Sequence, residues 1–349
     1  MRKKIVSLHG SYFRNNFGDI LLMKIFTQWI REYSPDVTVN YPLLKRNRII
    51  DPPDGTTCGL RNLLRSDALV FFGGGYFGEN PTHKHRWSFR NFYRHAMVAL
   101  LAIVFHIPYA ILGVEFGPLS VAWFRKVVVF IAKHADCILV RNTESLHFLK
   151  EHEIKNARLS CDAVLSLSDF VKPKRDSSHP DEILLHINRH NSQAIALINA
   201  IIVVLKEHNV NHVGVLEDEP GQLSHHIGAI AELFEKANIC IDKYEYEGTH
   251  KVVEIINHSD MVFTTKLHVG ITGIALNKKV FAAYIHPKTF RFHKQVNNQG
   301  NCVSLHEVDD AIVLKIREFF KQNRYTLSEQ ILEAARENKK ALYAFLNAI

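Results

Sequence analysis

Short runs of apolar residues alternate along the chain with longer segments in which apolar residues recur at helical spacing. The run at 4–8 is typical of a buried strand, the segment at about 20–33 of a helix, and the run at 37–41 of a second strand. Such alternation favours parallel βαβ units. After an irregular stretch with two prolines, the pattern predicts strands at 68–72, 109–113, 135–140 and 157–161, and helices that begin near Trp87, Val121 and Thr143.

A polar, charged segment at 172–180, which contains Pro173 and Pro180, interrupts this series as an inter-domain linker does. A second βα series follows it. Strands are predicted at 182–187, 212–216, near Ile239, at 261–264 and at 280–285, and helices at about 194–206, at about 223–237 and near Val252. The tail from Val308 is predicted to be helical.

These patterns predict an α/β protein with two Rossmann-like doubly wound domains, 1–171 and 181–306, and C-terminal helices at 307–349 that pack back across the domains. Open parallel sheets bind their ligands beyond the carboxyl ends of the strands, so we expect binding in a cleft that the two domains face. The architecture resembles the two-domain fold called GT-B. Fold alone does not give function.

The composition, 47% hydrophobic and 22% charged over 349 residues, is that of a globular protein. A net charge of +8 favours anionic partners, whether phosphorylated metabolites, nucleic acid or an acidic membrane surface. The five cysteines are at least 24 residues apart and form no zinc or disulfide framework, so we expect buried thiols in the reducing cytoplasm. The apolar stretch at 96–112 contains His106 and Pro108 and is short for a membrane span; a buried helix and a buried strand are expected there.

In the first domain, two loops that follow predicted strands are candidate binding elements. The sequence GGGYFG at 73–78 formally matches a dinucleotide loop, but no acidic residue stands about 20 positions further on, as such a site requires. Backbone amides of such a glycine cluster still approach a ligand closely, and a tight turn required by packing is the alternative. In the loop at 10–19, Asp19 is suited to cap a helix, while Arg14 favours a loop that faces a ligand.

In the second domain, Lys266 and His268 stand where a predicted strand meets a helix. A cation and an imidazole at that place suit an anionic substrate that also needs a proton moved. Arg189 follows the domain's first strand and carries a planar fork for a carboxylate or phosphate, with an ordinary surface arginine as the alternative. The acidic run at 217–219 is interpreted as a solvated turn. The sequence contains no HExxH, GxSxG, Walker or CxxC motif, and we predict no metal site.

Seven short motifs, in order over about residues 5–290, resemble those of the polysaccharide pyruvyl transferase family. They are Gly10 with NFGD at 16–19, FFGGG at 71–75, GVEFGP at 113–118, RNTES at 141–145, DAV at 162–164, KLH at 266–268 and YIHPK at 284–288. The chain departs from the family pattern at Lys266, where arginine is usual, and at Asn142, where aspartate is usual.

The resemblance implies transfer of pyruvate from phosphoenolpyruvate onto two hydroxyls of a sugar, in a bacterial surface polysaccharide or its lipid-linked precursor, to form a cyclic ketal with loss of phosphate. Phosphoenolpyruvate is then the donor substrate, and no other cofactor is implied. His268 is the candidate proton relay. The candidate donor-binding residues are Arg189, Lys266, Lys288, Gly73, Gly74 and Gly75, and the candidate acceptor-binding residues are Arg14, Asn16, Asp19 and Glu115.

Two other classes of function fit the same fold. A GT-B glycosyltransferase would turn over a nucleotide sugar and ignore phosphoenolpyruvate, and a non-catalytic glycan-binding relative would release no phosphate. Nucleic-acid binding is not expected, because no aromatic-basic RNA motif or recognition helix accompanies the positive charge.

The basic composition also predicts peripheral association with the inner face of the cytoplasmic membrane, where lipid-linked glycans are assembled. The candidate contacts are Lys84, Arg86, Arg90 and Arg94 beside Trp87, Phe89 and Phe92. A solvated helix face is the alternative.

Overall fold

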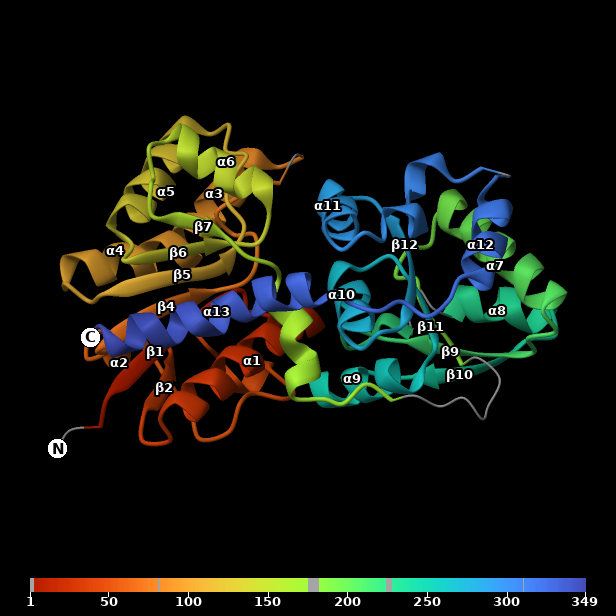
Figure 1. The fold of residues 1–349 in the computed structure, drawn as a ribbon, viewed down its shortest axis with the longest axis horizontal. Helices are drawn as coiled ribbons and strands as arrows, with labels where there is room; N and C mark the ends of the chain where they lie inside the picture. The colour runs from red at the N-terminus through yellow and green to blue at the C-terminus, as the bar shows by residue number, and fades with distance from the viewer. Residues whose placement is uncertain (1–2, 81, 175–181, 224–227, 310) are drawn as a thin grey trace. The chain divides into compact units, whose positions relative to one another are not determined.

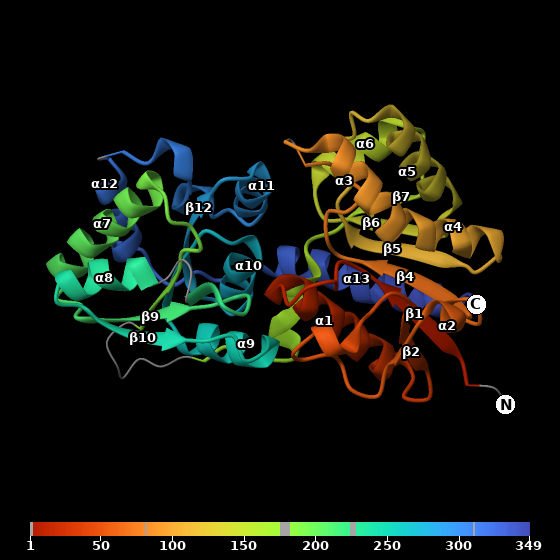
Figure 2. The same ribbon diagram turned by 180° about the vertical axis from the view of Figure 1, so that it is seen from behind.

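The computed structural model describes residues 3–80, 82–174, 182–223, 228–309 and 311–349. They form two compact units, Met1–Ala163 together with Glu329–Ile349, and Val164–Ser328 (Figures 1 and 2). Each unit is a parallel sheet covered by helices, which confirms the predicted α/β class.

The first unit contains a seven-stranded sheet in the order β3-β2-β1-β4-β5-β6-β7, and all of its pairs are parallel. Its central strand β4 is buried along its whole length, because a parallel sheet is covered on both faces. The strands are β1 (Ile5–His9), β2 (Thr38–Tyr41), β3 (Thr57–Cys58), β4 (Ala68–Phe72), β5 (Tyr109–Val114), β6 (Cys137–Val140) and β7 (Ala157–Leu159). The order reverses between β1 and β4, where ligands bind in folds of this type.

The helices of the first unit include one from the far end of the chain. They are α1 (Phe17–Tyr33), η1 (Arg46–Arg48), α2 (Leu60–Leu63), α3 (Lys84–Asn91), the π-helical turn η2 (Phe92–Ala96), α4 (Met97–Val104), α5 (Ala122–His134), α6 (Thr143–Glu151) and α13 (Glu329–Asn347). The buried Asn338 of α13 donates from Nδ2 to the carbonyl of Cys161, 2.9 Å away. This bond helps to fix α13 against the first sheet, along which Figure 1 shows it lying. The predicted C-terminal segment at 307–349 thus divides, since α12 belongs to the second unit.

The second unit contains a six-stranded parallel sheet in the order β10-β9-β8-β11-β12-β13. Its strands are β8 (Ile183–His186), β9 (His212–Leu216), β10 (Cys240–Tyr244), β11 (Met261–Thr264), β12 (Lys279–Tyr284) and β13 (Cys302–Ser304). Its helices are α7 (Ser192–Glu207), α8 (Gly228–Lys236), α9 (Thr249–His258), α10 (Leu267–Ala275), α11 (Pro287–Gln295), η5 (Gln299–Asn301), η6 (Leu305–Glu307) and α12 (Ile312–Lys321). The short η3 (Ala163–Asp169) runs across the boundary of the two units.

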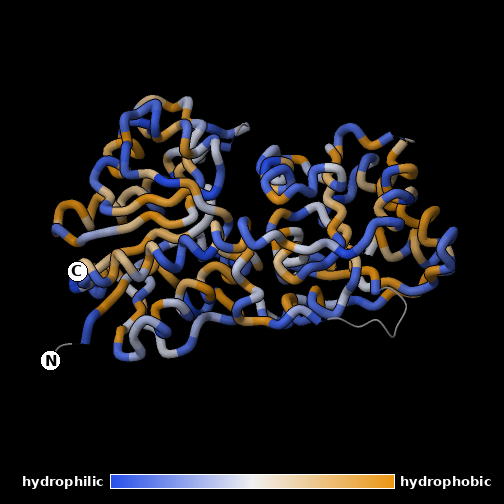
Figure 3. The backbone as a smooth tube through the Cα atoms, viewed as in Figure 1, coloured by the Kyte–Doolittle hydropathy of each residue, from blue (hydrophilic) through white to orange (hydrophobic). Residues whose placement is uncertain are grey.

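The core of each unit follows from the alternation of apolar strands and amphipathic helices that Figure 3 shows along the chain. In the second unit, Phe263 and Phe281 on neighbouring strands contact Phe319 of α12, with ring centroids 5.4 and 5.5 Å from it. These aromatic contacts lie in the buried cluster between the sheet and helices α7 and α12.

Two local expectations need correction. The helix predicted in the stretch at 96–112 is not buried on all sides, because Val104 at the end of α4 is 67% exposed. Of the five cysteines, only Cys161 and Cys302 are buried, and Cys240 is exposed.

Much of the predicted linker, residues 175–180, lies outside the described residues. Among the described helices, none combines the length and the apolar character that crossing a membrane requires.

The buried His293 of α11 makes stability depend on pH. Its Nδ1 accepts a hydrogen bond from Nδ2 of Asn298 at 2.9 Å, and burial lowers its pKa to about 4. Below about pH 6.5 the unfolded chain binds a proton at this position and the folded chain does not. The free energy of unfolding therefore decreases as the pH is lowered, by up to about 1.4 kcal/mol per pH unit. This loss continues until the pH reaches the folded pKa of about 4.

We expect His293→Gln to reduce the slope of unfolding free energy against pH between about pH 7 and about pH 5, measured by urea unfolding. The matched control is His147→Gln, at an exposed histidine of α6, which should leave the slope unchanged. Equal slopes for His293→Gln and the native chain would contradict this assignment.

Candidate functional site

The carboxyl edge of the second unit's sheet carries the predicted catalytic motif. Strand β11 ends at Thr264, and α10 begins at Leu267 with Lys266 as its N-cap residue. His268 is the second residue of α10 and is half-buried. It therefore lies in the first helical turn, where the helix dipole favours anions.

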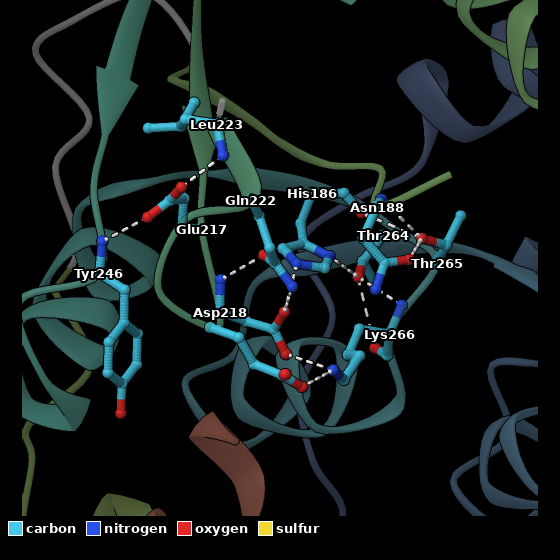
Figure 4. A network of polar contacts seen from close by, with 11 residues as sticks. His186, Asn188, Glu217, Asp218, Gln222, Leu223, Tyr246, Thr264, Thr265 and Lys266 are labelled. Atoms are coloured by element: carbon cyan, nitrogen blue, oxygen red, sulfur yellow. Dashed lines mark hydrogen bonds and ion pairs between the residues drawn. The ribbon is translucent and has the colours of Figure 1, made fainter. Parts of the chain in front are cut away.

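A buried polar network lies directly beside this motif (Figure 4). His186, the last residue of β8, donates from Nε2 to Oδ1 of Asp218 at 2.9 Å, and both side chains are almost completely buried. Lys266 Nζ lies 2.9 Å from Oδ2 of Asp218 and 2.8 Å from Oε1 of Glu219. Gln222 completes the shell of Asp218, donating to Oδ1 from Nε2 at 2.8 Å. One carboxylate thus connects the ends of β8 and β9 with the start of α10.

The acidic run at 217–219 is therefore not a solvated turn, and that prediction was wrong. Asp218 is completely buried and Glu217 is 3% exposed. Glu217 accepts hydrogen bonds from the backbone amides of Leu223 and Tyr246. The run directly follows β9, so its first two side chains lie at the carboxyl edge of the sheet. This position directly after a predicted strand was the signal in the sequence that could have indicated a role in the site.

The charged groups in this network stabilise one another's ionised forms. Burial alone would raise the pKa of Asp218, but His186 and Lys266 hold it well below its usual range. Burial opposes the charge of Lys266, yet Asp218 and Glu219 together raise its pKa. Because two carboxylates contact one ammonium, Lys266 does not present an unbalanced positive charge. Its predicted contact with a donor anion stays a prediction, and its geometry is that of a residue that holds the start of α10.

A second group of side chains at this edge of the sheet is cationic and more exposed. Arg189 lies between the end of β8 and the cap of α7, and Lys288 is the second residue of α11, after β12. Both side chains are exposed. The pKa of His286 is lowered by burial and then by the charges of Lys288 and Arg189. This group has the composition of an anion site.

The glycine loop of the first unit is shaped by close packing. Gly73 and Gly74 follow β4 with φ of +49° and +81°, which side chains rarely adopt. A Cβ on Gly73 would lie 2.5 Å from Cδ1 of Leu22, and one on Gly75 would lie 3.3 Å from Oε2 of Glu115. The amide of Gly73 donates to the carbonyl of Leu112 at 3.0 Å. Close packing therefore constrains Gly73, whose amide is used within the sheet. Donor binding by Gly73, Gly74 and Gly75 stays a prediction.

The polar residues of the loop after β1 have different surroundings: one caps α1 and another is exposed to solvent. Asn16 is the N-cap of α1 and accepts from the amide of Asp19 at 3.4 Å. Arg14 is exposed. Asn16 is the capping residue, which was expected of Asp19 instead.

Glu115 belongs to a buried ion triad in the first unit. Arg141 donates from Nη2 to Oε2 of Glu115 at 3.0 Å and from Nη1 to Oδ2 of Asp162 at 2.8 Å. All three are at most 7% exposed and follow β5, β6 and β7. Three of the seven motifs thus meet in one ion network. The carboxylate of Glu115 was predicted to bind an acceptor, and in the structure it forms an ion pair with Arg141.

The predicted donor residues are divided between the two units. Arg189, Lys266 and Lys288 belong to the second unit with His268, whereas the glycine loop belongs to the first. Asp218 and Arg141, the residue at the centre of each charged network, were not among the predicted site residues.

Comparison with models of protein families shows to which family the chain belongs. The model of the polysaccharide pyruvyl transferase family matches residues 16–287. The chain belongs to this family. None of the curated proteins compared with it matches. In this polysaccharide pyruvyl transferase family member, the match includes both charged networks and ends just before Lys288.

Solved structures similar to this pyruvyl transferase family member show the GT-B fold. One is a putative UDP-N-acetylglucosamine 2-epimerase from Listeria monocytogenes, with a TM-score of 0.64, 11% identity and coverage of 100% of this chain and 98% of that chain. Another is the UDP-GlcNAc 2-epimerase from Methanocaldococcus jannaschii, with a TM-score of 0.62 and 11% identity. The match covers 97% of this chain and 99% of that chain. At this identity the likeness is one of fold, and it confirms the predicted GT-B-like architecture.

The role of Asp218 is testable by stability. We expect Asp218→Asn to lower the free energy of unfolding by about 3 kcal/mol, because it leaves the ammonium of Lys266 with one carboxylate fewer in a buried network. The measurement is urea unfolding at neutral pH. The matched control is Asp242→Asn, whose ion pair with His212 is more than half exposed and should contribute less than about 1 kcal/mol. Equal effects of the two substitutions would refute the role of Asp218.

Proposed function

We propose that this protein transfers pyruvate from phosphoenolpyruvate onto two hydroxyls of a sugar in a surface polysaccharide or its lipid-linked precursor, forming a cyclic ketal. The observation that carries the proposal is the half-buried His268 in the first turn of α10, at the same sheet edge as the exposed cations Arg189 and Lys288. Membership of the pyruvyl transferase family supports the reaction class.

The donor matches the charges at this edge. Phosphoenolpyruvate carries a phosphate and a carboxylate, and two separate cations are suited to hold one each. Arg189 offers parallel donors for a planar anion, and Lys288 offers a compact charge. In this proposal Lys266 is a positioning residue, because Asp218 and Glu219 hold its ammonium.

His268 is the proposed proton relay. A proton adds to the methylene carbon of phosphoenolpyruvate, and the adjacent carbon becomes an oxocarbenium-like centre. The first sugar hydroxyl adds to this carbon and loses its proton. The second hydroxyl then replaces the phosphate, which leaves as inorganic phosphate, so that the products are the ketal and phosphate. An imidazole serves such steps because it both gives and takes protons near neutral pH.

The acceptor is assigned to the loops of the first unit, with Arg14 as the exposed candidate. Asn16 and Asp19 form the start of α1, and Glu115 pairs with Arg141, so these three would act mainly by shaping the loops.

The second candidate function is turnover of a nucleotide sugar. The fold likeness to UDP-GlcNAc 2-epimerases favours it, and a glycosyltransferase from Rickettsia africae is also similar in fold, with a TM-score of 0.54, 13% identity and coverage of 99% and 97%. Such an activity would consume a UDP-sugar with no need for phosphoenolpyruvate.

Phosphate release distinguishes the two functions. We expect the protein to release inorganic phosphate from phosphoenolpyruvate only when a suitable galactose, glucose or mannosamine acceptor, free or lipid-linked, is present.

In heavy water, deuterium should enter the methyl group of the ketal, because the proton comes from an exchangeable group. Turnover of UDP-sugars without phosphate release across the panel would instead establish the second candidate, and a ketal methyl without deuterium would contradict the oxocarbenium route.

The role of His268 is tested by a matched pair of variants. We expect His268→Asn to lower kcat by roughly 10²- to 10⁴-fold with a smaller change in KM for phosphoenolpyruvate, because proton transfer contributes chiefly in the transition state. His250 is likewise the second residue of its helix, α9, and His250→Asn should leave kcat unchanged. A folded His268→Asn protein whose only defect is a raised KM would refute the relay.

A further inference from the structure

The segment between Glu79 and Asp136 has an unusual charge distribution. It contains seven lysines and arginines but a single acidic residue, Glu115. Glu115 is 7% exposed and pairs with Arg141, so it contributes little negative charge to the surface. The helical part of this segment comprises α3, η2, α4 and α5, and its surface is strongly basic.

The same helices expose large apolar side chains. Phe89 of α3 is 55% exposed, Tyr93 of η2 is 66% exposed, and Val104 and Phe105 at the end of α4 are 67% and 51% exposed. Phe89, Tyr93 and Val104 recur at near-helical intervals along one continuous run of helix (Figure 2). We call the surface formed by Phe89, Tyr93, Val104 and Phe105, together with Trp123 and Phe130 of α5, the apolar face.

Helix α5 lies beside this run and extends the apolar face. The ring of Trp123 on α5 lies 5.1 Å from that of Phe89 and 5.6 Å from that of Phe92. Phe130, further along α5, is 44% exposed. Helix α4 consists entirely of apolar residues, and its buried side chains are Val98, Ala99 and Ala102. Its other side chains pack only partly against the core, and Val104 is exposed. A helix that is apolar on all sides is usually buried or in contact with lipid.

Three arginines, Arg86, Arg90 and Arg94, lie on α3 and η2 with Phe89 and Tyr93. The guanidinium carbon of Arg90 lies 4.0 Å from the centroid of the Trp87 ring, and that of Arg94 lies 4.7 Å from the Phe13 ring. The pKa of Arg90 is lowered by partial burial and by the neighbouring charges of Arg94, Arg14 and Arg86. Mutually repelling guanidinium groups are stabilised when anions approach them.

We propose that the apolar face and these three arginines bind the surface of an anionic phospholipid bilayer, with the rings in the interface and the cations on the headgroups. Exposed aromatic residues next to Lys and Arg on helices are the pattern of interfacial membrane contact. Two copies of the chain pairing through this face would bring like charges together, which disfavours a symmetric dimer. The proposal goes beyond the catalytic function and does not depend on it.

Vesicle binding tests the proposal without substrates. The full chain is sedimented with vesicles of phosphatidylglycerol and phosphatidylcholine in equal parts, and with vesicles of phosphatidylcholine alone. We expect binding to the anionic vesicles at low salt, and weaker binding at high salt because the headgroup attraction is screened. Arg86→Gln combined with Arg90→Gln should weaken binding by about thirtyfold, since each basic residue near the surface contributes about 1 kcal/mol.

Matched variants on α12 of the second unit control for charge and hydrophobicity. Lys315→Gln with Lys321→Gln removes two exposed cations there, and Leu314→Ser removes an apolar side chain that is 58% exposed. These changes should leave binding nearly unchanged, whereas Val104→Ser with Phe105→Ser should weaken it. Circular dichroism and sedimentation velocity of each variant show whether it is folded and monomeric. Equal binding to both vesicle types, no vesicle binding, or a dimer that the serine variants dissociate would overturn the proposal.

Discussion

Parallel strands direct all their carboxyl ends to one edge of the sheet, and in this protein buried charges meet at that edge. In the first unit, Arg141 connects the carboxylates of Glu115 and Asp162, so that the ends of three neighbouring strands share one guanidinium. Burying any one of these charges alone would cost several kcal/mol, and each therefore depends on the other two. The loops that follow these strands are fixed by this requirement before any ligand contacts them.

The second unit satisfies the same constraint with different groups. Asp218 pairs with Lys266 and accepts from His186, and together they fix the first turn of α10, which carries His268. Lys266 and His268 are separated by one residue, but their surroundings differ, because the ammonium contacts two carboxylates. The family motif thus combines a residue that holds the helix start with His268, which we propose as the proton relay.

The strand pattern predicted both sheets because periodicity reports burial, and burial is what the fold repeats from element to element. The parallel α/β class and the GT-B likeness were therefore accessible from sequence, as were β4 and β11. The two-residue β3 and the π-helical turn η2 were not, since neither is long enough to show a period. The burial of Asp218 could have been suspected from its place directly after a predicted strand, but its pairing with Lys266 could not, because that depends on the strand order.

Side-chain partners are what the sequence could not supply for the candidate site. Glu115 and Arg14 looked alike as polar residues in loops after strands, yet one is enclosed by Arg141 and the other is exposed. A charge that already has a buried partner adds little to ligand binding, because its field is largely cancelled. Exposed cations beside half-buried acids and bases are therefore better candidates for substrate contact than fully paired ones. By this criterion Arg189 ranks above Lys266 as a donor-binding residue, although only Lys266 lies within the most recognisable motif.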